Sequence, residues 1–122
     1  MSGTILVVDD SGLARRSARR ILEGAGYEVV EAEDGMSALE QYFVRRPAVV
    51  VLDLVMKGMY GLDVLAKIRE IDADAKVIVL SADIQTSSKD LVETGGACAF
   101  INKPVQASEL LSAIEDATRE GQ

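Results

Sequence analysis

Short apolar runs alternate with segments of helical periodicity along the whole chain, and this alternation limits the possible folds more than any other feature. The runs that predict buried strands cover residues 4–8, 27–32, 48–52, 77–80 and 97–101. The segments that predict helices cover residues 11–23, 35–45, 61–71, 86–94 and 108–118, with residue 106 as an alternative start of the last one. A strand followed by a helix, five times over, predicts a parallel sheet with helices on both faces.

The length of the chain decides between a closed and an open form of such a sheet. A closed barrel needs eight strand–helix units and about 250 residues, whereas this chain has 122. The sequence therefore predicts an α/β fold with an open, doubly wound five-stranded parallel sheet, most simply in the strand order 2-1-3-4-5. Residues 1–122 are expected to form a single domain with no output domain attached.

The helical segments differ in how clearly they are marked. In the first, Arg15, Arg16, Arg19 and Arg20 fall on the face opposite the apolar residues and are expected to face solvent. Asp34 is the expected cap of the second helix. The segment over residues 86–94 begins in a Thr-Ser-Ser run and has few apolar residues to bury, so it is the weakest helix of the five.

Composition excludes several classes of function. The chain has 13 basic and 20 acidic residues, a net charge of −7, which argues against nucleic-acid binding or an anionic membrane surface. It has no histidine, so a histidine base, a Ser-His-Asp triad, a His-ligated zinc and a self-phosphorylating histidine are excluded. One cysteine, Cys98, allows no internal disulfide. No apolar run approaches 18 residues and no signal peptide is evident, so we expect a soluble, cytoplasmic protein with no membrane insertion.

Polar residues follow four of the five predicted strands. The first strand is followed by Asp9 and Asp10, the third by Asp53, the fourth by Ser81 and the fifth by Lys103. In an open α/β sheet, ligands bind beyond the carboxyl ends of the strands, where the strand order reverses. For the order 2-1-3-4-5 that point lies between the first and third strands. The three carboxylates should meet there, with a hydroxyl and an ammonium beside them.

This set of side chains suits phosphoryl chemistry. Three close carboxylates repel one another unless a cation lies among them, and oxygen-only ligands favour Mg²⁺ or Mn²⁺ over zinc. Lys103 has a role if an anion also arrives, because an ammonium pairs with phosphate. These are the groups needed to move a phosphoryl group onto an aspartate. Taken singly, each has a plainer interpretation: Asp9 and Asp10 as a helix cap and first-turn acid, Asp53 and Ser81 as loop residues, and Lys103 as a solvated lysine.

These residues and their spacing resemble the receiver domain of bacterial two-component response regulators, and the single-domain chemotaxis regulators most of all. The motif consists of Asp9-Asp10, Asp53, Ser81 and Lys103-Pro104, and the resemblance extends from residue 5 to about residue 118. It implies the flavodoxin-like (βα)5 fold of that family. It also implies a phosphorylation-activated signalling switch that receives its phosphoryl group from a sensor histidine kinase or a phosphotransfer protein, and not a turnover enzyme.

The resemblance assigns a role to each matching residue. Asp53 would accept the phosphoryl group, and Asp10, Asp53 and the backbone carbonyl of Val55 would bind Mg²⁺. Asp9 would act on the metal mainly through a bound water. Lys103 would pair with the phosphate.

The resemblance also implies how a signal would leave the site. Ser81 would donate a hydrogen bond to the phosphoryl group, and Phe100 matches an aromatic switch position, with packing in the fifth strand as the alternative. The Lys103-Pro104 bond would be cis. A downstream protein would bind through the fourth and fifth helices, and a dimer formed on phosphorylation is left open.

The chain departs from the family pattern near the acceptor. Lys57 stands where proline is common, and a solvent-facing lysine is a simpler interpretation of it than a catalytic one. Val55 and Asp83 occupy positions that the family uses to tune the lifetime of the phosphoryl group. An apolar Val55 cannot orient an attacking water, whereas Asp83 could repel an anionic donor or orient a water.

Two other classes of function compete with the switch. A small Mg²⁺-dependent phosphatase with an aspartate nucleophile would want a second aspartate two residues beyond Asp53, where this chain has Val55. A flavodoxin-like binder of nucleotide or flavin would want a phosphate loop rich in Ser, Thr or Gly after the first strand. Asp9 and Asp10 give that position the wrong charge.

Overall fold

A computed structural model of the chain describes residues 3–54, 61–82 and 95–120. Its strands are β1 (Thr4–Val8), β2 (Glu28–Ala32), β3 (Val49–Asp53), β4 (Val77–Ser81) and β5 (Ala99–Asn102). Its helices are α1 (Gly12–Gly24), α2 (Gly35–Arg45), α3 (Gly61–Ile71) and α5 (Ala107–Glu120). The helix predicted over residues 86–94 lies outside the described residues.

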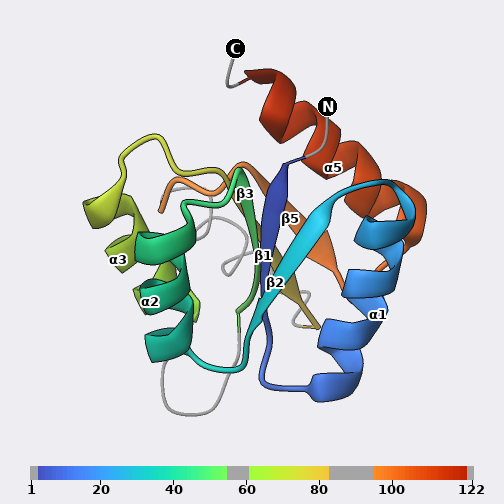
Figure 1. The fold of residues 1–122 in the computed structure, drawn as a ribbon, viewed down its shortest axis with the longest axis horizontal. Coiled ribbons are helices and arrows are strands. Elements are labelled where there is room, and N and C mark those ends of the chain that lie inside the picture. Colours follow the sequence, from blue (N-terminus) through green and yellow to red (C-terminus); the bar gives the residue numbers. More distant parts are fainter. Residues whose placement is uncertain (1–2, 55–60, 83–94, 121–122) are drawn as a thin grey trace.

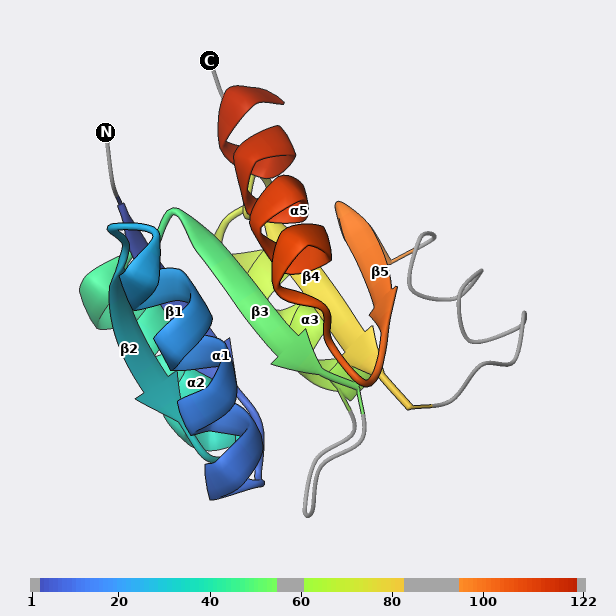
Figure 2. The same ribbon diagram turned by 90° about the vertical axis from the view of Figure 1, so that its right-hand side faces the viewer.

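The five strands form one parallel sheet in the order β2-β1-β3-β4-β5, as predicted. Figure 2 shows this order across the sheet, with α1 and α5 in front. In Figure 1 the sheet separates α2 and α3 on one side from α1 and α5 on the other. The reversal of strand order falls between β1 and β3, so the carboxyl ends of these two strands meet at the switch point.

Two apolar clusters fix the layers, one on each face of the sheet. Leu6, Val50 and Val79 belong to the cluster that α2 and α3 cover. Ile5, Val51 and Ile78 belong to the cluster that α1 and α5 cover. Successive strand residues point to opposite faces, so β3 and β4 are buried at every position because helices cover both sides.

The element bounds follow the predictions to within about two residues. Residues 35–45 and 61–71 are helical over the predicted spans. The last helix is longer than predicted, Ala107–Glu120. β3 and β4 each include the polar residue that follows the apolar run, because Asp53 pairs with Leu80 and Ser81 with Asn102 in the sheet ladder.

Side-chain caps set the start of two helices. The Ser11 hydroxyl accepts a hydrogen bond from the backbone N–H of Ala14 at the start of α1. The Asp34 carboxylate accepts one from Ser37 at the start of α2, at 2.8 Å. Both satisfy N–H groups that have no partner within the helix. The alternative that Asp9 and Asp10 cap the first helix is therefore wrong, since Ser11 is its N-cap.

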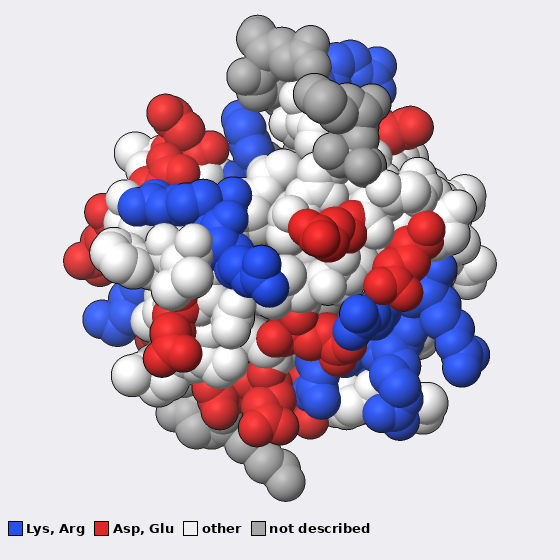
Figure 3. Space-filling view, in the orientation of Figure 1, with Lys and Arg blue, Asp and Glu red and all other residues white. Residues whose placement is uncertain are grey.

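Arg15 of α1 is largely buried, which corrects the prediction that all four arginines of this helix face solvent. Basic side chains gather over α1 in Figure 3. Arg16 and Arg20 are exposed, as predicted. Arg15 is only 17% exposed because its guanidinium pairs with Glu31 of β2 at 3.0 Å, and Arg19 pairs with the same carboxylate at 2.6 Å. In the described parts of the chain, no helix is long and apolar enough to cross a bilayer.

Candidate phosphoryl-acceptor site

The predicted polar residues meet at the carboxyl edge of the sheet. Asp9 follows β1, Asp53 and Ser81 are the last residues of β3 and β4, and Lys103 follows β5. The backbone joins these ends, since Leu54 donates to the Leu80 carbonyl at 2.9 Å and Lys103 to the Ser81 carbonyl at 2.8 Å. The register of a parallel sheet thus brings together residues that are far apart in the sequence.

Three carboxylates gather at the switch point. Each of Asp9, Asp10 and Asp53 offers an oxygen atom that lies within 4.8 Å of the other two. Asp9 and Asp53 are buried, at 3% and 6% exposure, whereas Asp10 is exposed. An all-oxygen cluster open to solvent on one side suits a hard divalent cation that keeps some of its water. The predicted grouping of the three aspartates is confirmed, and their donor set fits Mg²⁺.

Lys103 enters this acidic cluster from the β5 side. Its Nζ lies 2.9 Å from Oδ2 of Asp9 and 3.4 Å from Oδ1 of Asp53. Burial works against the ammonium charge, but the hydrogen bond to Asp9 and the charge of Asp53 outweigh it and raise the pKa of Lys103. The lysine therefore stays charged between two buried carboxylates. The following peptide bond, to Pro104, is cis, as predicted.

The ionised carboxylate of Asp53 is disfavoured by its surroundings. Burial and the charge of Asp9 raise its pKa from 3.8 to about 6, and Asp10 adds to this rise. The ammonium of Lys103 opposes the rise without cancelling it. At neutral pH the carboxylate is ionised against its surroundings, and an added positive charge would relieve that cost.

Asp9 is held in one orientation by its neighbours. Its Oδ1 accepts a hydrogen bond from the Ser11 backbone N–H at 2.9 Å, and its Oδ2 pairs with Lys103. Its backbone carbonyl accepts from Nη1 of Arg15 at 2.6 Å. The turn between β1 and α1 is thus fixed at both the side chain and the backbone, which positions the carboxylate for its role in the cluster.

The Arg15–Glu31 pair was missed by sequence reasoning. The pair joins α1 to β2, and Arg15 also donates to the Asp9 carbonyl. It therefore stabilises the turn that carries Asp9. The hydrogen bonds from Arg19 and Arg15 lower the pKa of Glu31 although its partial burial opposes this. Glu31, beside apolar residues in the predicted second strand, was the available signal, but periodicity alone could not say which arginine would reach it.

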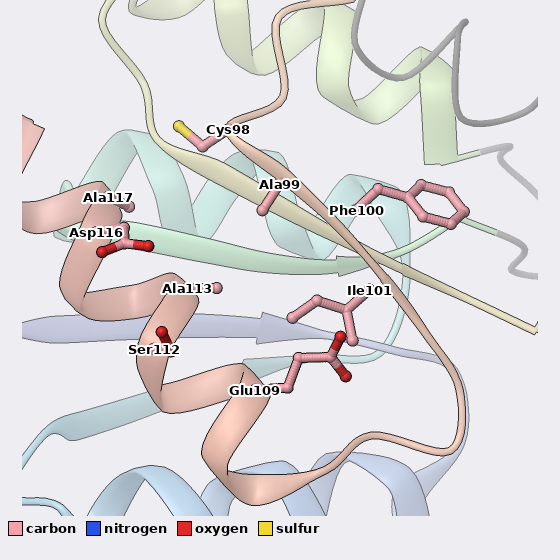
Figure 4. A pocket seen from close by; sticks show the side chains of 9 residues that line it. All are labelled: Cys98, Ala99, Phe100, Ile101, Glu109, Ser112, Ala113, Asp116 and Ala117. Atoms are coloured by element: carbon pink, nitrogen blue, oxygen red, sulfur yellow. The ribbon is translucent and has the colours of Figure 1, made fainter.

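Ser81 and Phe100 lie on the neighbouring strands β4 and β5, two positions apart in the ladder, where Ser81 pairs with Asn102. Ser81 is buried at 1% exposure, and Phe100 pairs with Val79, two residues earlier in β4. The Phe100 side chain is half-buried and packs against the cluster under α2 and α3. Figure 4 shows its ring pointing away from α5, whereas Ala99 and Ile101 point toward it. The two predicted switch residues are therefore neighbours, and their role stays a prediction.

Gly61 closes the segment that follows Asp53. Its N–H donates to the Leu54 carbonyl at 2.7 Å, and a Cβ built on it would lie 2.5 Å from that oxygen and 2.6 Å from the Leu54 Cα. Only glycine allows this approach of backbone to backbone. Val55, Lys57 and Asp83, which figured in the sequence predictions, lie outside the described residues.

Comparison with known proteins decides the family. Residues 5–115 match the family described as "Response regulator receiver domain". The chain belongs to this family. CheY-type receiver domains are phosphorylation-activated switches of two-component signalling, so the predicted family and function are confirmed. This also favours the switch over the phosphatase and the flavin or nucleotide binder.

Individual relatives agree with this assignment over nearly the whole receiver domain. The chain is 42% identical over 115 residues to the chemotaxis protein CheY of Bacillus subtilis, covering 93% of this chain and 96% of that protein. A CheY-like receiver domain protein from Methanospirillum hungatei superposes with a TM-score of 0.92 at 28% identity, covering 98% and 96%. CheY of Borrelia burgdorferi, solved as a CheX-CheY-BeF3-Mg²⁺ complex, has a TM-score of 0.89 at 29% identity, covering 93% and 87%.

Proposed function

We propose that this receiver domain accepts a phosphoryl group on the Asp53 carboxylate from a phosphohistidine of a sensor kinase or phosphotransfer protein. The observation that carries the proposal is the position of Asp53. It lies at the end of a fully buried strand, inside a carboxylate cluster, with the Lys103 ammonium 3.4 Å away. No other carboxylate of the described residues combines burial, a raised pKa and an adjacent cation in this way.

The transfer conserves atoms and charge with no further reactant than a proton. A carboxylate oxygen of Asp53 forms the new P–O bond as the P–N bond of the phosphohistidine breaks. The imidazole leaves with the bond's electron pair and takes up a proton. The product is an acyl phosphate on Asp53, and the chain itself turns over no external substrate beyond this transfer and its slow hydrolysis.

Magnesium fits the same residues, because Asp10, Asp53 and the backbone carbonyl predicted at Val55 provide oxygen ligands beside the acceptor. When bound, Mg²⁺ would supply the positive charge that lets an anionic donor approach three carboxylates. Asp9 supports the site from its fixed turn, where Ser11 and Lys103 hold its two oxygens.

Lys103 and Ser81 are assigned to the incoming phosphoryl oxygens. Lys103 already bridges Asp9 and Asp53, so its ammonium needs only a small movement to pair with a phosphate on Asp53. Ser81 ends the neighbouring strand and would donate its hydroxyl proton to a phosphoryl oxygen. A movement of Ser81 changes the space beside Phe100 in the next strand, which couples the site to β5.

The output surface is assigned to α5 and the predicted fourth helix. In the described part of this surface, a cavity of about 370 Å³ lies between β5 and α5, with Phe100, Ile101 and Ser112 among its walls. A movement of Phe100 that shifts β5, one wall of this cavity, would alter the binding of a target protein. A cytoplasmic location, a stand-alone receiver domain and a dimer formed on phosphorylation remain predictions.

The proposal is tested by labelling. Incubation with Mg²⁺ and acetyl phosphate should add one phosphate, stable to acid and labile to base and hydroxylamine, as an acyl phosphate is. Asp53→Asn should abolish the label, and Asp116→Asn, at an exposed carboxylate of α5, should retain it. Full labelling of Asp53→Asn would assign the acceptor elsewhere, and continuous release of phosphate without a retained label would indicate a phosphatase.

A further inference from the structure

Helix α2 has apolar residues on two sides. Gly35, Ala38 and Tyr42 are buried against the sheet. On the outer side, Met36, Phe43 and Val44 are 70%, 65% and 69% exposed. They are three of the five large apolar residues that are exposed in the described parts of the chain. Single exposed apolar residues are ordinary, but three on one short helix form a patch that indicates a partner.

Two of these outer residues, together with the half-buried Leu39, have the spacing of a helix-pairing seam. Met36, Leu39 and Phe43 follow one another at intervals of three and four, which is the heptad pattern of helices that pack side by side. Leu39 is half-buried and links this seam to the core. The guanidinium of Arg46 lies 5.7 Å from the centre of the Phe43 ring, so a charge borders the apolar surface at its end.

The charges on this helix are divided between its ends. Glu33 and Asp34 are exposed at its start, and Arg45 and Arg46 are exposed at its end. Figure 3 shows this face at the left of the molecule, with basic side chains above, acidic side chains below and uncoloured surface between them. A second helix of the same sequence, running in the opposite direction, would place its basic end on this acidic end and its acidic end on this basic end.

We propose that α2 is a self-association surface, on which two copies of this chain pair their α2 helices antiparallel. With the two-fold axis between Leu39 and Glu40, Met36 of each copy lies level with Phe43 of the other. Glu33, which precedes the helix, then comes near Arg46 of the second copy, which follows it. The seam, the end charges and the opposed helix dipoles all match in this one arrangement.

The self-complementary charge pattern is the reason to prefer a second copy over another protein as the occupant. Each end contact forms twice in the pair, so one favourable pairing counts double in a symmetric dimer. The contact is small, because an 11-residue helix is only about 16 Å long. We therefore expect a weak dimer, with a dissociation constant on the order of 10⁻⁴ M.

Sedimentation equilibrium of the unphosphorylated protein, without Mg²⁺, tests the pairing between about 10 µM and about 1 mM. The natural sequence should dimerise across this range. Phe43→Ser should weaken the dimer roughly tenfold or more. Leu13→Ser is the matched control, because Leu13 is 74% exposed on α1, outside the proposed surface, and should leave the dimer unchanged.

Charge exchange tests the antiparallel orientation. Glu33→Arg places two basic residues, at positions 33 and 46, opposite each other in the pair, and Arg46→Glu places two acidic residues there. Each variant alone should therefore dimerise roughly five-fold more weakly. An equimolar mixture should recover the dimer, because every end contact of the mixed pair is again between opposite charges. Glu40→Gln should strengthen the dimer. The two Glu40 carboxylates lie close to the two-fold axis on the same face of the helix pair, where their like charges repel each other.

Three results would overturn the proposal. The first is a natural sequence that stays monomeric at about 1 mM. The second is a mixture of the two charge variants that associates no better than either alone. The third is a loss of association in Leu13→Ser equal to that in Phe43→Ser. Thermal unfolding of each variant, followed by circular dichroism, separates a lost contact from a lost fold.

Discussion

Replacing Asp53 by asparagine should stabilise the metal-free protein at neutral pH. Burial and the charge of Asp9 raise the pKa of Asp53 to about 6 in the folded state. The ordinary value for an aspartate, which applies to the unfolded chain, is 3.8. Asparagine has nearly the shape of the protonated acid but never ionises. A difference of about two pKa units corresponds to roughly 3 kcal/mol, and some relaxation of the site in the natural protein reduces the expected gain to about 2–3 kcal/mol.

The gain should depend on pH in one direction only. A carboxyl whose folded pKa is raised binds its proton more tightly when folded, so the protein loses stability as pH rises from about 4 through about 6. Asp53→Asn removes that loss. Its gain should be full at about pH 8 and close to zero at about pH 4, where Asp53 is already protonated in the folded protein.

The contacts of Lys103 explain why Asp53→Asn should raise the free energy of unfolding and not lower it. Removing one partner of a buried cation is costly when it leaves the cation alone. Here Lys103 keeps its shorter contact, 2.9 Å to Asp9. Asp9→Asn removes that contact and disturbs the acceptor of the Ser11 N–H, so it should stabilise less or destabilise. Asp10→Asn changes an exposed carboxylate and should give only a small gain.

Urea unfolding in EDTA, at about pH 8 and about pH 4.5, measures the difference. Added Mg²⁺ should stabilise the natural protein and have less effect on Asp53→Asn, because a cation stabilises the charge that the variant lacks. If Asp53→Asn raises the free energy of unfolding equally at both pH values, or lowers it at the higher one, ionised Asp53 does not destabilise the metal-free cluster and the reasoning is refuted.

Two further predictions concern the coupling and the closure of the site. Ser81→Ala should leave Asp53 open to phosphorylation but reduce the amide shifts that beryllofluoride causes between Phe100 and Val105. The lost charge-assisted hydrogen bond is worth roughly 1.5–3 kcal/mol, and full shifts in the variant would exclude Ser81 as the link. Gly61→Ala should lower the free energy of unfolding by about 1–3 kcal/mol, because its Cβ meets the Leu54 backbone at 2.5–2.6 Å. Gly24→Ala, which meets nothing within 4 Å, is its control in the same chemical denaturation, and equal losses in the two variants would refute the clash.

The sheet and the site could be predicted because the residue types that define them indicate whether each position is buried or lies at the end of a strand. Residues 49–52 and 77–80 are apolar at successive positions, which is typical of a strand covered on both faces. Once the strand order is fixed, polar residues at the strand ends must meet. The grouping of Asp9, Asp10 and Asp53 with Lys103 follows from topology, without any information on side-chain contacts.

The features that sequence reasoning missed are pairings between surfaces. Arg15 and Glu31 are 16 residues apart on different elements, and nothing local distinguishes Arg15 from the exposed Arg16. Similarly, α2 has apolar residues on two sides, and periodicity alone does not indicate which side packs against the sheet. The structure buries Tyr42, whose hydroxyl donates to Asp72 at 3.0 Å, and leaves Phe43 outside.

The hydrogen bond between Gly61 and Leu54 joins the two residues that flank segment 55–60. The Gly61 nitrogen lies 2.7 Å from the Leu54 carbonyl oxygen, and this backbone contact uses no side chain of segment 55–60. Lengthening a closed loop costs little, about 0.6 kcal/mol for each doubling. Mutations or insertions in this segment can therefore alter the chemistry beside the acceptor during evolution while β3 and α3 keep their places. Such a junction is also a suitable place to insert a reporter peptide next to Asp53.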